Sequence, residues 1–317
     1  MKKIVLSLAI VSMLFSCNKQ EDSISTDGNL SETVGKRGCY SDQHLKDQLA
    51  ADPSLASRME EFELNAAQAI AQGRIVNGVL EIPVVVNVLY RTTAENISLA
   101  QIQSQIDALN KDFNATNSDY NTANNPYSSV RANVGIRFVL DQVIRKSTTK
   151  TSWGTNDAMK STAQGGMAAV SPTTKLNLWI CTIGGGILGY AQFPGGASST
   201  DGVAIDSKYF GTTGTATYPY NLGRTATHEI GHWMNLRHIW GDATCGSDLV
   251  SDTPVHNTAN YGVPAVGHRS TCTGTPLEMY MNYMDYTDDR GMYMFSAGQK
   301  TRMLAVFAVG GSRASFR

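Results

Sequence analysis

Charge is scarce in this sequence of 317 residues, and cysteine scarcer still. Charged side chains make up 17% of the chain and nearly balance, giving a net charge of −1, so no basic stripe is present to attract nucleic acid. No apolar run is long enough for a stable membrane-spanning helix. Since 42% of the residues are hydrophobic, we expect a globular monomer that buries a sizeable core in one large or two small domains.

The N-terminus has the pattern of an export signal. Met1-Lys2-Lys3 supplies positive charge and residues 4–15 supply a short apolar run, which together predict a signal peptide over residues 1–17. The run ends in Leu14-Phe15-Ser16-Cys17, which resembles a bacterial lipobox with Cys17 as the lipidated residue; a plain signal peptide with a chance cysteine is the alternative. Residues 18–36 are polar and predict a flexible tether. We therefore expect a protein that is secreted or lipid-anchored in the bacterial envelope, with no other membrane contact.

Four cysteines remain after Cys17. Cys245 and Cys272 flank a turn-rich region that a covalent link would stabilise, and an oxidising compartment permits a disulfide, so we pair them. Cys181 lies in an apolar run and is interpreted as a buried hydrophobic residue. Cys39 is left unpaired.

Hydrophobic periodicity predicts alternating helices and strands. Apolar residues at mostly three- or four-residue spacing predict a helix over 44–72, interrupted by Pro53 near its start and stopped by Gly73. A second helix, capped by Ser98, presents its apolar face over 102–113. β-Branched or alternating runs predict strands over 80–90, 135–143, 176–183, 188–194 and 202–206, with Pro194 at a sheet edge. The order favours an α/β (α+β) fold with a twisted sheet.

One run has the spacing of a metal site. His228 and His232 are four residues apart and would share one face of a helix, with Glu229 beside them. Asn235 tolerates the left-handed conformation that turns a chain sharply, so His238 can return to the same ion. Three nitrogen ligands leave a fourth position open, as catalytic zinc requires. Two surface histidines on an amphipathic helix are the alternative interpretation.

The extended run resembles a family signature. His228-Glu229-x-x-His232-x-x-Asn235-x-x-His238 is similar to the metzincin motif, with Asn235 in place of its usual glycine. Residues 282–288, Asn-Tyr-Met-Asp-Tyr-Thr-Asp, resemble the Met-turn of the pappalysin and cytophagalysin (ulilysin-like) family. Gly241-Asp242 and residues 186–193 also fit that family. The resemblance covers about residues 80–304.

The resemblance implies a metalloprotease catalytic domain over 75–317, divided by a cleft. An upper subdomain (75–235) would hold a mostly parallel sheet with an antiparallel edge strand and the active-site helix, and a smaller irregular lower one would span 236–317. Met284 would pack beneath the zinc, and Tyr286 would contribute to the site by donating a hydrogen bond to the tetrahedral intermediate. A core methionine and a buried structural tyrosine are the alternatives.

Glu229 is then expected to act as base and later as acid in zinc-dependent hydrolysis of protein and peptide bonds. The strand near residues 188–193 would bind substrate by main-chain hydrogen bonds. Two rival functions stay open: a noncatalytic adhesive lipoprotein that retains the fold, and a zinc hydrolase with a nonprotein substrate.

Residues 37–74 resemble an inhibitory prosegment. Arg37-Gly38-Cys39-Tyr40 is similar to the family's zinc-blocking cysteine motif, since a thiolate can occupy the fourth position on zinc. An incidental free thiol is the alternative for Cys39. Cleavage near Gly73-Arg74 would release the segment.

Two further sites are expected from their acidic residues. The resemblance implies structural calcium near Asp248, Asp252 and Thr253, whose oxygen atoms suit that ion, although turns favour aspartate for other reasons. After the Met-turn, Asp288 or Asp289 would attract a basic substrate side chain, whereas Arg290 would repel one.

Overall fold

The computed structural model describes residues 36–73, 78–120 and 125–317. The predicted export signal, Cys17, nearly all of the predicted tether and Arg74 lie outside these ranges. Within them, no helix combines the length and apolar character needed to cross a membrane.

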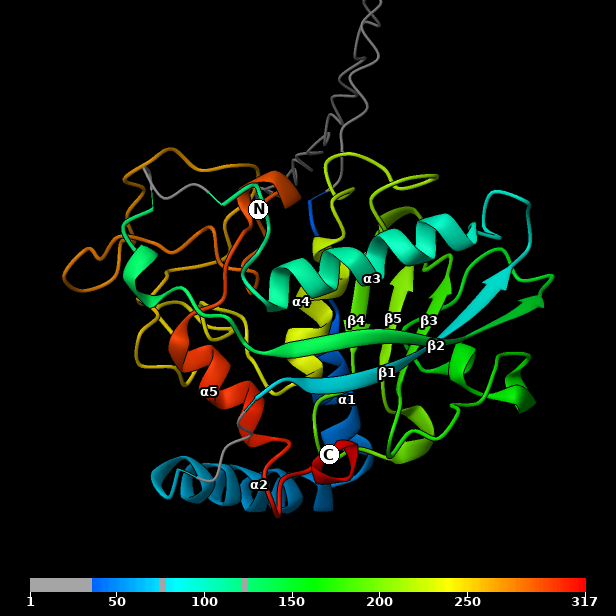
Figure 1. The fold of residues 1–317 in the computed structure, drawn as a ribbon, viewed down its shortest axis with the longest axis horizontal. Helices are drawn as coiled ribbons and strands as arrows, with labels where there is room; N and C mark the ends of the chain where they lie inside the picture. The colour runs from blue at the N-terminus through cyan, green and yellow to red at the C-terminus, as the bar shows by residue number, and fades with distance from the viewer. Residues whose placement is uncertain (1–35, 74–77, 121–124) are drawn as a thin grey trace, which may run out of the picture. The chain divides into compact units, whose positions relative to one another are not determined.

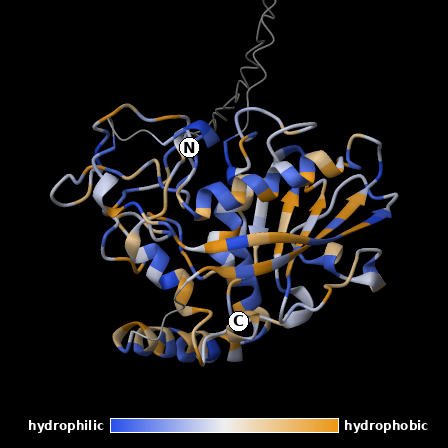
Figure 2. Cartoon of the chain, in the orientation of Figure 1, coloured by the Kyte–Doolittle hydropathy of each residue, from blue (hydrophilic) through white to orange (hydrophobic). Residues whose placement is uncertain are grey.

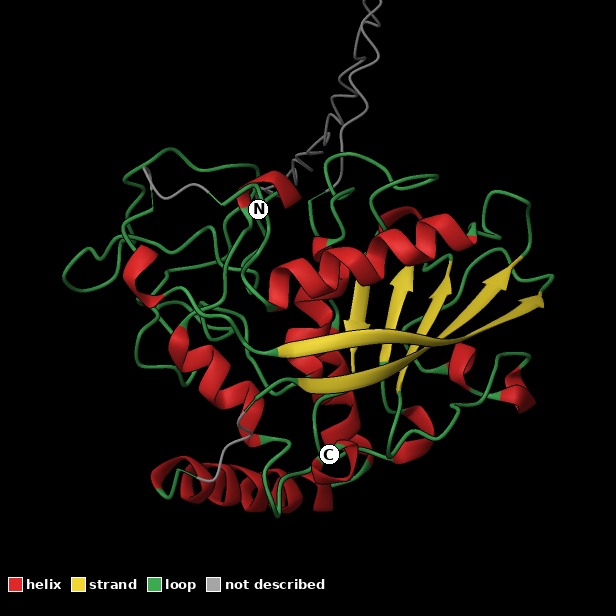
Figure 3. Ribbon diagram, viewed as in Figure 1, coloured by secondary structure: helices red, strands yellow, loops and turns green. Residues whose placement is uncertain are grey.

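A five-stranded sheet runs through the fold (Figures 1 and 3). Its strands are β1 (Leu80–Tyr90), β2 (Ile136–Ser147), β3 (Leu176–Cys181), β4 (Gly189–Ala191) and β5 (Val203–Asp206). They lie in the order β2-β1-β3-β5-β4, all parallel except β4, which pairs antiparallel with β5 at the edge. This confirms the predicted sheet. β2 extends four residues beyond the predicted end because it continues to pair with β1 as far as Tyr90.

The sheet core follows from the apolar runs. Residues 84–86 and Val88 of β1 are fully buried because β2 and β3 flank the strand and helices or loops cover its faces. Helix α3 (Leu99–Phe113) begins at Ser98, whose side chain accepts from the backbone N–H of Gln101. Figure 2 shows the hydrophobic residues concentrated along the strands.

The single helix predicted over 44–72 is wrong, because the segment forms two helices, α1 (Ser41–Ala51) and α2 (Ser54–Ala71). Proline has no N–H and disfavours a helical conformation in the residue before it. Asp52 accordingly leaves the helical region, with φ −135° and ψ 90°, and Pro53 is the N-cap residue of α2.

Beyond helix α4 (Arg224–Trp233), regular structure is sparse until α5 (Ala297–Ala305), which Ser296 and Gln299 begin with a capping box. Figure 3 shows that loops make up most of this part. The Cys245–Cys272 disulfide lies within it, as predicted. Cys181, also as predicted, is fully buried and unpaired.

Candidate metal centre

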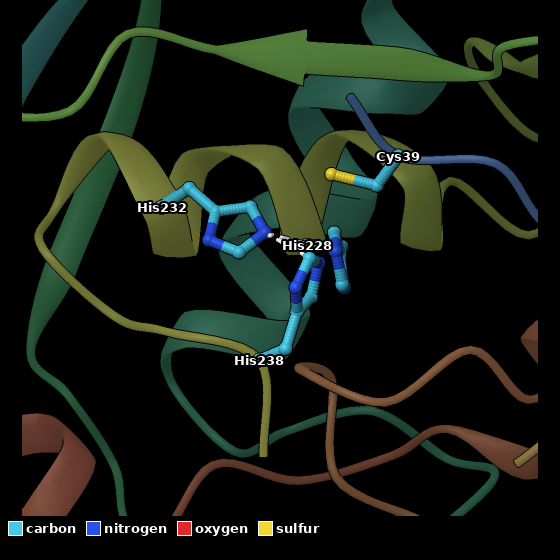
Figure 4. A group of neighbouring side chains, drawn as sticks. All are labelled: Cys39, His228, His232 and His238. Atoms are coloured by element: carbon cyan, nitrogen blue, oxygen red, sulfur yellow. Dashed lines mark hydrogen bonds between the residues drawn. The ribbon is translucent and has the colours of Figure 1, made fainter. Parts of the chain in front are cut away.

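Three histidines converge at the end of α4 (Figure 4). His228 and His232 lie one helical turn apart, and Asn235, with φ 71°, turns the chain so that His238 comes back beside them. Nε2 of His232 lies 3.1 Å from Nε2 of His228 and 3.1 Å from Nε2 of His238. No more than 2% of each histidine is exposed. The predicted trio is therefore brought together.

The other ring nitrogens show which atoms are free to bind a metal. Nδ1 of His228 lies 2.7 Å from the Tyr283 carbonyl oxygen, and Nδ1 of His232 lies 2.8 Å from the Leu236 carbonyl oxygen. Since a carbonyl only accepts, each Nδ1 carries the hydrogen and each Nε2 presents a lone pair. Burial lowers the pKa of His232 to about 3 and that of His228 well below its usual range, so both rings are neutral. Lone pairs this close repel one another unless a cation lies between them, and the donor set therefore fits a metal ion.

Cys39 completes the cluster. Its sulfur and one nitrogen of each histidine all lie within 4.8 Å of one another, and in Figure 4 the sulfur points toward the rings. In the part of the chain that the structure describes, this is the group of metal-binding side chains found close enough to share an ion. Imidazole nitrogen and thiolate sulfur are zinc ligands, whereas calcium prefers oxygen.

The chain around Cys39 lies along the edge strand β4. The Gly38 carbonyl accepts from the N–H of Leu188 at 2.8 Å, and the N–H of Tyr40 donates to the Gly189 carbonyl at 3.2 Å. The bridge between Cys39 and Gly189 is parallel. The strand predicted to offer main-chain hydrogen bonds does so here, with the chain's own N-terminal segment as its partner.

Ser41 contacts the residue expected to be the catalytic base. Its hydroxyl, fully buried, donates to Oε2 of Glu229 at 2.8 Å and accepts from the Ala191 N–H at 2.8 Å. The Cys39 thiol lies 3.4 Å from the same carboxylate oxygen. Burial raises the pKa of Glu229 to about 7, while the hydrogen bonds from Ser41 and Cys39 oppose that rise. Two side chains of the N-terminal segment thus occupy the position where this carboxylate would meet a substrate or water.

The Arg37 side chain is buried against Asp289, Thr287 and Tyr220. Its guanidinium lies 2.5 Å from Oδ1 of Asp289, donates to the Thr287 carbonyl at 3.3 Å and covers the Tyr220 ring at 4.7 Å. Oδ2 of Asp289 accepts from the backbone N–H groups of Leu222 and Arg224 at the start of α4. Asp289 is therefore held in place and presents its other oxygen to a cation.

The remaining acidic candidate, Asp288, has a different role. Its carboxylate faces the exposed Arg290 at 4.0 Å. Of the two aspartates expected to attract a basic side chain, Asp289 is the one that binds Arg37.

The Met-turn residues lie beside the histidines. A Cβ added to Gly231 would lie 2.5 Å from Sδ of Met284, so the glycine allows Met284 to pack directly against α4. Tyr286 has its ring 4.9 Å from His238 and donates its hydroxyl to the Cys39 carbonyl at 3.3 Å. Burial raises the pKa of Tyr286 well above its usual range, which keeps the hydroxyl protonated as a donor.

The three residues expected to bind calcium are used in protein hydrogen bonds. Thr253 donates to both oxygens of Asp248 at 2.9 Å, and burial raises the pKa of that carboxyl to about 6. Asp252 accepts from the Ser296 hydroxyl and the Gly298 N–H. The calcium site stays a prediction.

Sequence reasoning missed the roles of Ser41, Arg37 and Tyr220. Arg37 belongs to the same Arg37-Gly38-Cys39-Tyr40 motif as Cys39, so its position two residues before Cys39 could have indicated a role in inhibition. No sequence motif marks Ser41 or Tyr220, because serine and tyrosine are common and the residues that they contact are distant in sequence.

The sequence of this chain is similar to those of known peptidases. The family described as pregnancy-associated plasma protein-A, a peptidase family, matches residues 170–308. Curated relatives include extracellular metalloproteases of Pyricularia oryzae, 36% identical over 76% of this chain and 81% of the relative, and of Sordaria macrospora, 32% identical over 87% and 89%.

Two solved structures from Tannerella forsythia are also similar. A mutant of promirolysin has a TM-score of 0.80 and 38% identity, covering 88% of this chain and 97% of that one. Mature mirolysin in complex with a cleaved peptide has a TM-score of 0.73 and 41% identity, covering 76% and 96%.

Proposed function

The chain belongs to the pregnancy-associated plasma protein-A family and is a zinc metalloendopeptidase; from that premise we propose that His228, His232 and His238 bind its catalytic zinc. The convergence of three Nε2 lone pairs, two of them fixed by Nδ1–H bonds to carbonyl oxygens, is the observation that carries this proposal. When bound, zinc supplies a Lewis acid that polarises a peptide carbonyl and makes water more acidic.

Glu229 acts as the proton carrier. Its carboxylate already accepts hydrogen bonds from the Ser41 hydroxyl and the Cys39 thiol. The same geometry suits removal of a proton from the attacking water and its return to the departing amine.

Tyr286 stabilises the charge that develops on the substrate carbonyl oxygen. Its hydroxyl already donates to a peptide carbonyl, that of Cys39. A donor held in this place by packing against His238 is prepared for an oxyanion. Met284 supports the site from below by packing against α4.

Residues 37–74 form an inhibitory prosegment, and the catalytic domain follows over 75–317. Promirolysin covers 88% of this chain and the mature form 76%, a difference of about the length of residues 36–73. Within the segment Cys39 would hold the metal together with the three histidines, since its sulfur lies within 4.8 Å of their nitrogen atoms. Burial and the nearby Glu229 charge raise the pKa of its thiol well above the usual range, so a thiolate there would need the positive charge of a metal ion held by the three neutral histidines.

Activation then requires loss of the contacts made by three prosegment side chains, Arg37, Cys39 and Ser41. Cleavage near Gly73-Arg74, at the end of α2, separates the segment from the catalytic domain. Of the proposed subdomains, the upper one (75–235) supplies His228 and His232 and the lower one (236–317) supplies His238.

The pocket around Asp289 selects a basic side chain, and arginine best. Arg37 shows the fit, with one hydrogen bond to a carboxylate, one to a carbonyl and a ring beneath the guanidinium. Lysine has one nitrogen and makes fewer of these contacts.

The protein is exported. Its curated relatives are named extracellular metalloproteases, which supports secretion. A lipid anchor on Cys17 is a finer proposal: labelled palmitate should be incorporated by the parent but not by Cys17→Ala, and no incorporation by the parent removes it.

The test of the function is Glu229→Ala, processed by an added protease because the variant does not process itself. We expect it to retain zinc at the parental stoichiometry and to lose about 100- to 10,000-fold in turnover, the contribution usual for a general base. His232→Ala is the matched control that should lose zinc as well. Casein zymography with and without chelator also tests the noncatalytic rival. If the processed parent clears no more casein without the chelator than with it, the peptidase proposal is refuted.

A further inference from the structure

The third metal histidine is held differently from the first two. Nδ1 of His228 and of His232 each faces a backbone carbonyl. Nδ1 of His238 instead faces Oδ1 of Asp242 in a short contact. Among the three, His238 is thus the one with a carboxylate as its partner.

His238 also lacks the support of a helix. His228 and His232 are oriented by the backbone of α4, which ends at Trp233, whereas His238 lies in the coil beyond. The ring of Trp240 stacks on it with centroids 4.4 Å apart and planes 6° from parallel. Stacking restrains the tilt of an imidazole but leaves rotation within its plane, so a hydrogen bond is needed to aim Nε2.

The backbone of the turn directs the Asp242 carboxylate toward His238. Gly241 and Asp242 have φ values of 65° and 55°, two successive left-handed residues, of which the second is not glycine. A Cβ on Gly241 would lie 2.4 Å from the Ser247 nitrogen, so only glycine fits there. The Gly241 N–H donates to the His238 carbonyl at 2.8 Å and closes the turn. The chain thereby returns the Asp242 carboxylate to the ring four residues before it.

We propose that Asp242 is a positioning residue for the catalytic zinc, which fixes the tautomer and orientation of His238 and increases its strength as a ligand. This inference rests on the proposed function, in which His238 binds the metal. A carboxylate on Nδ1–H keeps the hydrogen there, aims the Nε2 lone pair at the ion and makes the imidazole a stronger donor.

The test measures zinc affinity rather than turnover. Full-length chains carrying Glu229→Ala, which do not process themselves, are compared by chelator competition in three forms: unchanged, Asp242→Ala and Asp242→Asn. We expect Asp242→Ala to bind zinc about 10- to 100-fold more weakly, the usual loss for an outer partner of a metal histidine. Asp242→Asn retains a hydrogen-bond acceptor but no charge, so its zinc affinity should lie between that of the unchanged chain and that of Asp242→Ala.

Two further readouts separate positioning from a structural role in the turn. The thermal midpoint of the metal-free chain should be unchanged by Asp242→Asn, and the visible bands of the cobalt-substituted chain should shift. Asp107→Ala, which removes an exposed aspartate on α3, is the control and should change neither. If Asp242→Ala does not fold, Asp242→Asn carries the test.

Zinc affinity within twofold of the parent in a folded Asp242 variant overturns the proposal, as does a loss of metal-free stability without a loss of affinity. His238→Ala distinguishes this outcome from failure of the proposed function. That variant should lose most of the zinc affinity, and if it does not, His238 is not a ligand.

Discussion

Replacing Ser41 with alanine should weaken the inhibition by the prosegment while leaving Cys39 in place. The Ser41 hydroxyl is fully buried and makes two hydrogen bonds of 2.8 Å, one to the Glu229 carboxylate and one from the Ala191 N–H. A hydrogen bond to a charged group contributes roughly 1.5–3 kcal/mol, so its loss should raise the open fraction of the zymogen about ten- to hundredfold. Alanine also leaves the Ala191 N–H without its acceptor, which acts in the same direction.

The assay is the initial rate of cleavage of a quenched fluorescent peptide by the unprocessed chain, with processing followed by electrophoresis. Ser57→Ala, on the exposed surface of α2, is the matched control and should leave the rate unchanged. Because Cys39 and Ser41 both approach Oε2 of Glu229, the double variant should not show the sum of the two single effects. A Ser41→Ala zymogen as silent as the parent, alongside a fully active Cys39→Ala zymogen, would refute the idea that the prosegment restrains the base.

Three other predictions concern specificity, stability and metal content. Asp289→Asn should lower kcat/KM about 10- to 100-fold for peptides whose arginine side chain binds at Asp289, because one charged hydrogen bond is lost. The kcat/KM for peptides with a neutral side chain at that position should change little. An equal loss for the arginine and the neutral peptides would contradict the assignment of Asp289 to substrate selection. Cys245→Ser should lower the free energy of unfolding by about 3–4 kcal/mol, because the disulfide joins residues 27 apart, and urea titration with and without reductant measures it. Chelation should abolish activity, and recovery with zinc alone would count against a calcium requirement at Asp248 and Asp252.

Much of the fold, and the pairing of His228 with His232, were predictable because they depend on local spacing. The valine-rich run of β1 predicts a central strand wherever the rest of the chain lies, since its side chains need burial on both faces. His228 and His232 share a helix face by periodicity alone. The single helix predicted over 44–72 failed at the one position, Pro53, where local chemistry outweighed the apolar pattern.

Tertiary structure decided which side chains meet across long sequence separations. Ser41 reaches Glu229 across 188 residues, and Arg37 reaches Asp289 across 252. No periodicity predicts such pairs, because their distance depends on the path of the whole chain and not on the conformation of a segment. Spacing and family resemblance predicted the three histidines and Glu229 from the sequence, whereas the packing of the N-terminal segment along β4 brought Ser41 to Glu229, Arg37 to Asp289 and the Cys39 carbonyl to Tyr286. Local spacing constrains neighbours through backbone geometry, and only the folded core brings distant residues within hydrogen-bond range.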